Sequence, residues 1–135
     1  MNFSANLDLR IDWSEMDLFG HVNNVAFMKY VQAGRVNYWE KIGLTKIHHE
    51  TNKGPMLAST QCTFLKPLHY PGNLTVQTRL EFIKTTSFGL HHQILNDKHE
   101  VVAEAHDVVV MFDFDKNEKM PVPEEIRRAI EEIEN

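Results

Sequence analysis

The segment DWSEMDLFGHVNNVAFMKYV, residues 12–31, could bring a carboxylate next to the start of a helix. Asp17 lies about six residues before the expected helix start, where Asn23 or Asn24 can cap the helix with a side-chain carbonyl. Gly20 lies between them and lets the backbone turn sharply and a ligand approach. The first turn of a helix offers unbonded N–H groups and a positive dipole end, which can hold a carbonyl oxygen as it becomes an oxyanion. A carboxylate beside such donors is the minimum set of groups for acyl transfer, and the alternative is an ordinary capped helix.

The length, charge and cysteine content of the chain limit the classes of protein to which it can belong. The 135 residues are enough for one core but too few for two ordinary ones, so we expect a single domain over residues 1–135. The net charge of −5, with no run of Lys or Arg beyond pairs, argues against a nucleic-acid surface. No apolar stretch approaches the roughly 20 residues that a membrane span needs. One cysteine, Cys62, cannot form an internal disulfide, and the N-terminus lacks a signal-peptide pattern, so we expect a cytoplasmic protein.

Hydrophobic periodicity predicts the elements that position this segment. Residues 6–13 alternate apolar and polar side chains as a half-buried strand does, and residues 24–42 are predicted to form the main helix. The first half of that helix is apolar on nearly every side, which indicates a helix surrounded by other elements. The sequence IGL at 42–44 provides a glycine stop, and the segment that follows, through Pro55, is predicted to be a polar connection. Strands are then predicted over residues 56–66, 73–84, 87–97 and 100–114, and a terminal helix in PVPEEIRRAIEEIEN.

The order of these elements predicts an α+β architecture. A five-stranded antiparallel sheet wrapped around a long central helix, with a short C-terminal helix, satisfies both the apolar helix and the alternating strands. The short breaks after residues 84 and 97 favour hairpins, so the last four strands are predicted to form a meander. The final strand, residues 100–114, is long enough to pair with a second copy, which favours a homodimer or homotetramer.

The motif DLFGHVNN, followed by a buried helix that contains aromatic residues, resembles the hotdog-fold acyl-CoA thioesterases of the 4-hydroxybenzoyl-CoA thioesterase-like family. Its HVNN part is also similar to a segment of the plant acyl-acyl carrier protein thioesterases. The resemblance covers most of the chain. It implies a hotdog fold and an enzyme that hydrolyses an acyl-CoA to free acid and CoA without a cofactor. Two alternatives remain open, an acyl-acyl carrier protein thioesterase and a non-catalytic hotdog protein that binds acyl-CoA.

The resemblance also implies roles for the residues of the motif. The aspartate of the family's Asp-x-x-Gly motif is the catalytic carboxylate, which is Asp17 here, acting as nucleophile or as general base. Backbone amides at the start of the helix, here those of Asn24 and Val25, polarise the thioester carbonyl. His21 and Asn23 match the plant pattern and complete the expected catalytic set, in which they shape the loop. His21 could also orient the substrate or Asp17, and the alternative is that it only bonds the loop backbone. Many relatives carry a histidine where this chain has Asn24.

A second set of residues is expected to bind the CoA part of the substrate. Gly20 leaves room for the ligand. The segments KPLHYPG and KTTSFG lie at strand ends, where the family holds the pantetheine and phosphates of CoA across a subunit interface. The matching residues are Lys66, Lys84, Thr86 and Ser87, because lysine can contact phosphate and hydroxyls can bond phosphate or amide groups. Hairpin formation alone also explains KTTS, so this alternative stays open.

Other residues that could do chemistry favour structural roles. Asp12 and Glu15 are near Asp17, but their strand-to-loop positions can direct both side chains to solvent. His91 and His92 are neighbours on a predicted strand and therefore face opposite sides, so they cannot easily bind one ion, and we expect no metal site. Cys62 has no adjacent base in the sequence and is expected to be packed rather than nucleophilic.

Overall fold

The computed structural model describes residues 2–135. In chain order its elements are β1 (Ala5–Arg10), the 3-10 helix η1 (Trp13–Glu15), α1 (Asn24–Lys41), α2 (Leu44–Thr51), β2 (Lys53–Phe64), β3 (Asn73–Ile83), β4 (Ser87–Leu95), β5 (Val101–Asp113), β6 (Glu118–Lys119) and α3 (Glu124–Glu134).

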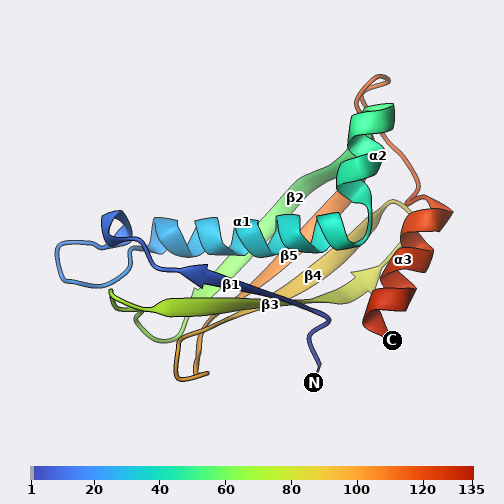
Figure 1. Ribbon diagram of the computed structural model, residues 1–135. Helices are drawn as coiled ribbons and strands as arrows, with labels where there is room; N and C mark the ends of the chain where they lie inside the picture. The colour runs from blue at the N-terminus through green and yellow to red at the C-terminus, as the bar shows by residue number, and fades with distance from the viewer. Residues whose placement is uncertain (1) are drawn as a thin grey trace.

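The strands form one antiparallel sheet in the order β1-β3-β4-β5-β2, and the short strand β6 pairs with the end of β5. The sheet curves around α1, and α3 lies at the end of the molecule where α1 ends (Figure 1). Five long antiparallel strands, a central helix and a short terminal helix are therefore confirmed. This is the arrangement that the hotdog resemblance predicts.

The predicted order of the strands is wrong at one point. Strands β3, β4 and β5 do follow one another as hairpins, but β2 pairs with β5, from Lys53 opposite Asp113 to Phe64 opposite Ala103. The connection over residues 65–72 is too long for a tight hairpin and carries the chain past two strands before β3 begins. The last long strand is consequently interior, which corrects the expectation that it pairs with a second copy. The edges of the sheet are β1 and β2.

The segment after Gly43 forms a helix, α2, rather than the predicted polar connection. Gly43 ends α1 with a φ of +87°, as a glycine stop should. Leu44 is fully buried and Ile47 packs against the same cluster, while the other side chains of α2 are exposed and mostly polar. Two apolar side chains are too few to give a clear helical pattern in the sequence.

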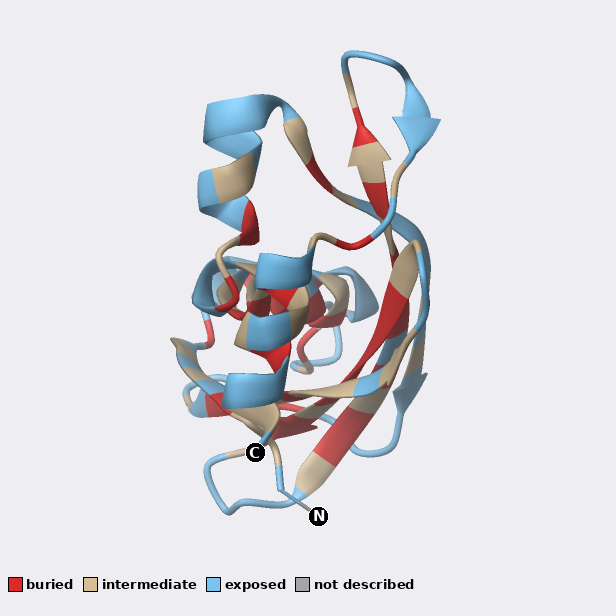
Figure 2. Cartoon of the chain, turned by 90° about the vertical axis from the view of Figure 1, so that its right-hand side faces the viewer, coloured by how far each residue is buried: buried red, intermediate tan, exposed pale blue. Residues whose placement is uncertain are grey.

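One side of α1 faces solvent, which corrects the expectation of a helix surrounded by other elements. The side chains that face the sheet are buried, as the red segments of the central helix indicate (Figure 2). The exposed side chains recur at helical spacing: Val25, Lys29, Gln32, Val36 and Glu40. The hydrophobic pattern led to a wrong prediction because two of the exposed residues are valines, whereas the buried side of the helix includes the charged Arg35.

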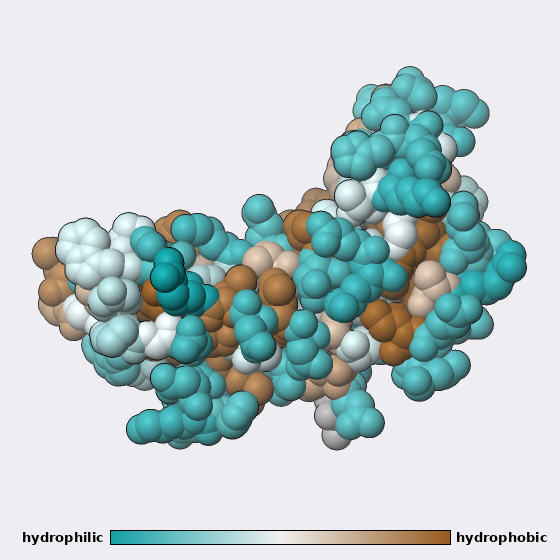
Figure 3. All heavy atoms as spheres, viewed as in Figure 1, coloured by the Kyte–Doolittle hydropathy of each residue, from teal (hydrophilic) through white to brown (hydrophobic). Residues whose placement is uncertain are grey.

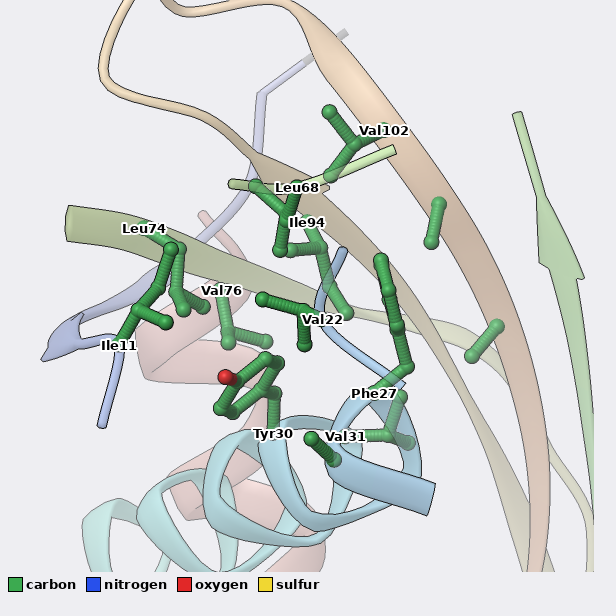
Figure 4. Close-up of a cluster of buried hydrophobic side chains, with 13 residues drawn as sticks. Ile11, Val22, Phe27, Tyr30, Val31, Leu68, Leu74, Val76, Ile94 and Val102 are labelled. Atoms are coloured by element: carbon green, nitrogen blue, oxygen red, sulfur yellow. The ribbon is translucent and has the colours of Figure 1, made fainter. Parts of the chain in front are cut away.

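The hydrophobic core has two parts along α1. Under the first half of the helix, Phe27, Tyr30 and Val31 pack with residues of the strands and loops, including Val76 and Ile94 (Figure 4). Under its second half, a further cluster joins the helix to α2, α3 and the sheet, with Tyr38, Ile42, Leu44, Phe88, Leu90, Met111, Ile126 and Ile130 buried.

A buried polar network separates the two clusters. Asp107 of β5 accepts hydrogen bonds from Arg35 of α1 at 2.9 and 3.2 Å and from Thr60 of β2 at 2.7 Å. His92 of β4 lies 2.6 Å from Asp107 and bonds on its other side to Thr78 of β3. Burial raises the pKa of Asp107, but the hydrogen bonds and charges of His92 and Arg35 outweigh it and lower this pKa to about 2. The network thereby joins α1 to four strands.

The C-terminal helix α3 is confirmed and closes the second cluster. Ile126 and Ile130 are buried, and the acidic side of the helix is exposed. The Tyr38 hydroxyl donates to Glu134 at 2.8 Å, which joins α1 to the end of α3. Over residues 2–135, none of the helices has both the length and the apolar character that crossing a bilayer requires.

Candidate active site

A buried carboxylate holds the loop between β1 and α1. Glu15, at the end of η1, is only 7% exposed. It accepts hydrogen bonds from the Asp12 amide at 2.8 Å and the Tyr30 hydroxyl at 2.7 Å, and it pairs with Lys29 at 3.1 Å. The expectation that Glu15 points to solvent is therefore wrong. Because Lys29 and Tyr30 belong to α1, Glu15 fixes the loop to the first turns of the helix.

The same contacts perturb two pKa values. Burial raises the pKa of Glu15, but the hydrogen bonds from Asp12, Tyr30 and Lys29 outweigh it and leave this pKa below its usual range. Burial and the bond to Glu15 raise the pKa of Tyr30 far above its ordinary value. Glu15 is thus held as a carboxylate and Tyr30 as a neutral hydroxyl, which keeps the hydrogen bond between them intact.

Asp17 closes a tight turn with one of its carboxylate oxygens. Its Oδ1 accepts hydrogen bonds from the amides of Phe19 at 2.8 Å and His21 at 3.1 Å. The Asp17 amide donates to the carbonyl of His21 at 2.7 Å, and Gly20 has a φ of +79°, which glycine adopts without strain. Within residues 2–135 no group bonds to Oδ2 of Asp17. One oxygen therefore fixes the turn while the other is available to a ligand.

The helix start behaves as predicted. Asn23 is the cap, and its side-chain oxygen accepts a hydrogen bond from the Ala26 amide at 2.8 Å. The amides of Asn24 and Val25 precede Ala26 in the first turn and bond to no acceptor in the described part of the chain. Two backbone donors thus point outward at the positive end of an 18-residue helix.

Asp17, His21 and Asn24 line one cavity of about 360 Å³. This is an ordinary size for a small-molecule pocket. Lys66, which pairs with Glu100 at 2.7 Å, also lines this cavity. The other wall residues are apolar: Val22, Phe27, Phe64, Leu65 and Pro67. The rings of Phe27 and Phe64 meet edge to face, 5.2 Å between centroids. A carboxylate, the first residue of the helix and an apolar wall therefore meet in one place.

Three other residues of the motif lie next to this cavity but do not line it. The side chain of Asn23 caps α1, and Gly20 provides the positive φ of the turn. The side chain of Val25 is exposed, so only its backbone amide can contribute to the site. Leu18 and Phe19 at the tip of the loop are largely exposed. Figure 3 shows apolar surface at this end of the molecule, beside the start of α1.

Lys84, Thr86 and Ser87 lie at the opposite end of the chain's sheet from Asp17. Strand β3 begins at Asn73, beside the end of β1, and extends roughly 35 Å at about 3.3 Å per residue before it reaches Lys84. There the hairpin is bonded to α3, since Arg127 donates to the carbonyl of Lys84. Within one chain, therefore, the cavity brings Lys66 to Asp17 but not the three hairpin residues.

Sequence reasoning missed Glu15 as a positioning residue. The signal was present as the capping box that Asp12 and Glu15 form around η1.

Two predictions about residues outside the site are confirmed. Cys62 is partly buried and packs against the first core cluster, as predicted, and its burial together with the nearby charge of Asp107 raises the pKa of its thiol. His91 and His92 face opposite sides of the sheet, as predicted: His92 bonds to Asp107 in the buried polar network, whereas the ring of His91 stacks on that of His106.

The comparison with protein families agrees with this geometry. The sequence matches the family profile described as the thioesterase-like superfamily over residues 11–130. The chain belongs to this superfamily. Among curated relatives, it is 29% identical over 124 residues to the acyl-acyl carrier protein thioesterase ATL3, chloroplastic, of Arabidopsis thaliana, covering 90% of this chain and 64% of that protein. It is 28% identical over 91 residues to the protein YsmA of Bacillus subtilis, covering 67% of this chain and 60% of YsmA.

Solved structures of superfamily members share the fold. The PA2801 protein of Pseudomonas aeruginosa superposes with a TM-score of 0.85 at 29% identity, covering 96% of this chain and 99% of that one. A thioesterase from Thermus thermophilus, complexed with coenzyme A and Zn, superposes with a TM-score of 0.86 at 23% identity, covering 98% and 95%. The chain spans about three fifths of the length of the curated relatives it matches.

Proposed function

We propose that this protein is an acyl-CoA thioesterase that uses Asp17 as its catalytic carboxylate. One observation carries the proposal: Asp17 and Asn24, the first residue of α1, line the same cavity, and the amides of Asn24 and the adjacent Val25 have no acceptor in the described part of the chain. A thioester carbonyl between them meets a carboxylate oxygen on one side and hydrogen-bond donors on the other. Membership of the thioesterase-like superfamily supports the same chemistry.

Asp17 can act by either of two routes in this geometry. As a nucleophile, its Oδ2 attacks the carbonyl carbon, the C–S bond breaks, and the thiolate takes a proton from water; water then hydrolyses the acyl-aspartate. As a general base, it removes a proton from water, the hydroxide attacks, the C–S bond breaks, and the proton passes to the thiolate. In both routes the negative oxygen of the intermediate is held by the helix amides. Single turnover in ¹⁸O-labelled water tests the first route: attack of water on the Asp17 carbon of the anhydride leaves label in Asp17, whereas the general-base route puts the label in the product acid alone.

Three features support an acyl-CoA as the substrate. The apolar wall with Phe27 and Phe64 suits an acyl group, and Lys66, which pairs with Glu100, lines the same cavity and can offer its cation to a phosphate of CoA. The structurally similar Thermus thermophilus protein is complexed with coenzyme A. The similarity to ATL3 keeps an acyl-acyl carrier protein thioesterase as the second candidate.

The active form in this proposal is a homodimer that pairs its β2 edges. Strand β2 is 12 residues long, forms an edge of the sheet and exposes Met56 and Leu57, whereas long open edges are normally covered. Antiparallel pairing of two β2 strands reverses the second copy, so its β3–β4 hairpin comes to the end of the dimer that holds Asp17 of the first. Lys84, Thr86 and Ser87 of the second copy are then on the side from which CoA enters.

Release of free thiol tests this function. We expect turnover of acyl-CoA by the wild-type protein, slower turnover of the same acyl group on acyl carrier protein, and a dimer in sedimentation. Binding of acyl-CoA without thiol release would make the protein a non-catalytic binder, and faster release from acyl carrier protein would select the second candidate.

A further inference from the structure

The C-terminal helix α3 holds the hairpin between β3 and β4 by its backbone. The guanidinium of Arg127 donates hydrogen bonds to the carbonyls of Lys84 and Thr85, the second at 3.1 Å. The amide of Val122, just before α3, donates to the same Thr85 carbonyl at 2.8 Å. Within residues 2–135 Arg127 forms no ion pair, so these two carbonyls are the partners of its charge. The helix lies beside the end of the sheet that it clamps (Figure 1).

The donors of the same hairpin are free. In the described part of the chain, the amides of Thr85 and Thr86 donate to no acceptor. The side-chain hydrogen bonds to this hairpin within residues 2–135 all come from Arg127, so the hydroxyls of both threonines and of Ser87 are unbonded. Lys84 is exposed and forms no ion pair there. Amides, hydroxyls and an ammonium group all suit phosphate oxygens. The carbonyls of the hairpin are thus held while its donors remain available.

Fixing the carbonyls helps such donors in two ways. Carbonyl oxygens carry partial negative charge that repels a phosphate, and the guanidinium of Arg127 offsets this charge. Donors whose conformation is fixed beforehand also lose less freedom on binding. The helix that carries Arg127 is itself held, because Ile126 and Ile130 are buried in the second core cluster. The hydrogen bond from Tyr38 to Glu134 ties the end of α3 to α1. The helix therefore connects the core to the conformation of the hairpin.

We propose that Arg127 is a positioning residue for the active site of the other copy in the proposed homodimer. Through the carbonyls of Lys84 and Thr85 it holds the hairpin in the conformation that presents its donors to CoA. Within one chain this hairpin lies far from Asp17, so the effect of Arg127 reaches Asp17 of the second copy. The inference rests on the proposed thioesterase function and deepens it, because each active site then depends on the C-terminal helix of the other copy.

The kinetic test compares two neighbouring arginines of α3. Arg127→Gln is expected to raise KM for an acyl-CoA about tenfold, with kcat nearly unchanged, because the donors still exist but are no longer held. The same acyl group on pantetheine, which lacks the nucleotide and its phosphates, should show no change in KM. Arg127→Lys keeps the charge and should restore part of the loss. Arg128→Gln is the matched control, since Arg128 is exposed and forms no ion pair in the described residues. Equal changes for both substrates, or in both variants, would overturn the proposal.

Mixed dimers test whether Arg127 acts on the other copy. One copy carries Asp17→Asn and the other carries Arg127→Gln, with two affinity tags to isolate the mixed form. One of the two sites then combines an intact Asp17 with a hairpin held by an intact Arg127, and the other site has neither. We expect the KM of the wild-type protein with about half of its kcat per dimer. The raised KM of Arg127→Gln in the mixed dimer would show that the residue acts within its own chain, and would overturn the proposal.

A binding measurement separates this inference from the hydrolysis. Adenosine 3′,5′-bisphosphate, which carries phosphates of CoA but no thioester, is expected to bind about tenfold more weakly to Arg127→Gln than to Arg128→Gln in calorimetry. Weaker binding to Arg127→Gln without hydrolysis of any thioester supports the role of Arg127 and contradicts the proposed function. Hydrolysis by the wild-type protein with equal binding to the two variants overturns the role of Arg127 and leaves the proposed function standing.

Discussion

Replacing Asp107 with asparagine removes the charge at the centre of the network between the two core clusters. Asp107 is 2% exposed and receives hydrogen bonds from Arg35 and Thr60, with His92 at 2.6 Å. The substitution leaves the guanidinium of Arg35 buried without an opposite charge, which costs about 3–5 kcal/mol when a buried pair is broken. For a chain of this size, we expect the melting temperature to fall by roughly 10–20 °C.

A double-mutant cycle tests whether this cost comes from the unpaired charge. Arg35→Met alone and Asp107→Asn alone each break the pair, whereas the combined variant leaves no buried charge in it. We expect the combined variant to be at least about 2 kcal/mol more stable than the sum of the single losses predicts, measured by urea unfolding followed by circular dichroism. Additive losses would refute the view that Arg35 and Asp107 act as a pair.

The same network predicts a pH dependence. The pKa of Asp107 is about 2 in the folded protein and 3.8 is its ordinary value, a difference worth roughly 2.5 kcal/mol. Because the folded-state pKa is the lower one, this stability is fully present above about pH 5 and is lost as the pH falls through 3.8 toward 2. Asp107→Asn should lack this part of the acid-induced loss. An equal loss in both proteins between about pH 5 and 2 would contradict the assignment.

Three further substitutions probe other parts of the structure. Glu15→Gln removes the charge that Lys29 and Tyr30 bind, and we expect a loss of about 1–3 kcal/mol in urea unfolding together with a lower kcat/KM; unchanged values would remove Glu15 as a positioning residue. Phe64→Ala widens the cavity beside Phe27 and should raise kcat/KM for longer acyl-CoAs about tenfold relative to acetyl-CoA, whereas a parallel change for all chain lengths would exclude it from selectivity. Gly34→Ala puts a methyl group 2.5 Å from a methyl carbon of Val76, so thermal unfolding should show a loss of about 1–3 kcal/mol; a gain in stability would mean that α1 can shift away from the sheet.

The sequence predicts best what depends on neighbouring residues. The start of α1 follows from an asparagine before an apolar run, and the turn at Asp17 follows from an aspartate three residues before a glycine. The strands β3, β4 and β5 were also located from the sequence. Burial alternates along much of β3 and β5, whereas β4 is buried on both faces from Phe88 to His92. These local signals were sufficient to identify the carboxylate and the helix amides of the candidate site.

Features that depend on distant contacts were missed. Nothing near β2 in the sequence specifies that it pairs with β5, because that choice depends on the path of the loop over residues 65–72. Arg35 is buried only because Asp107, far along the chain, receives its hydrogen bonds. Lys84, Thr86 and Ser87 of the β3–β4 hairpin lie at the end of the sheet that is far from Asp17. The sequence motif KTTSFG does not indicate at which end of the sheet the hairpin lies.

The central claim is that the carboxylate of Asp17 carries thioester hydrolysis, and Asp17→Asn tests it most directly. The amide keeps an oxygen that can accept hydrogen bonds from Phe19 and His21, so the turn is expected to remain folded. We predict that kcat/KM for an acyl-CoA falls by at least about 10³-fold, a loss of about 4 kcal/mol in transition-state stabilisation, with an unchanged melting temperature. Hydrolysis within tenfold of the wild-type rate, by a variant that is equally stable, would contradict the account.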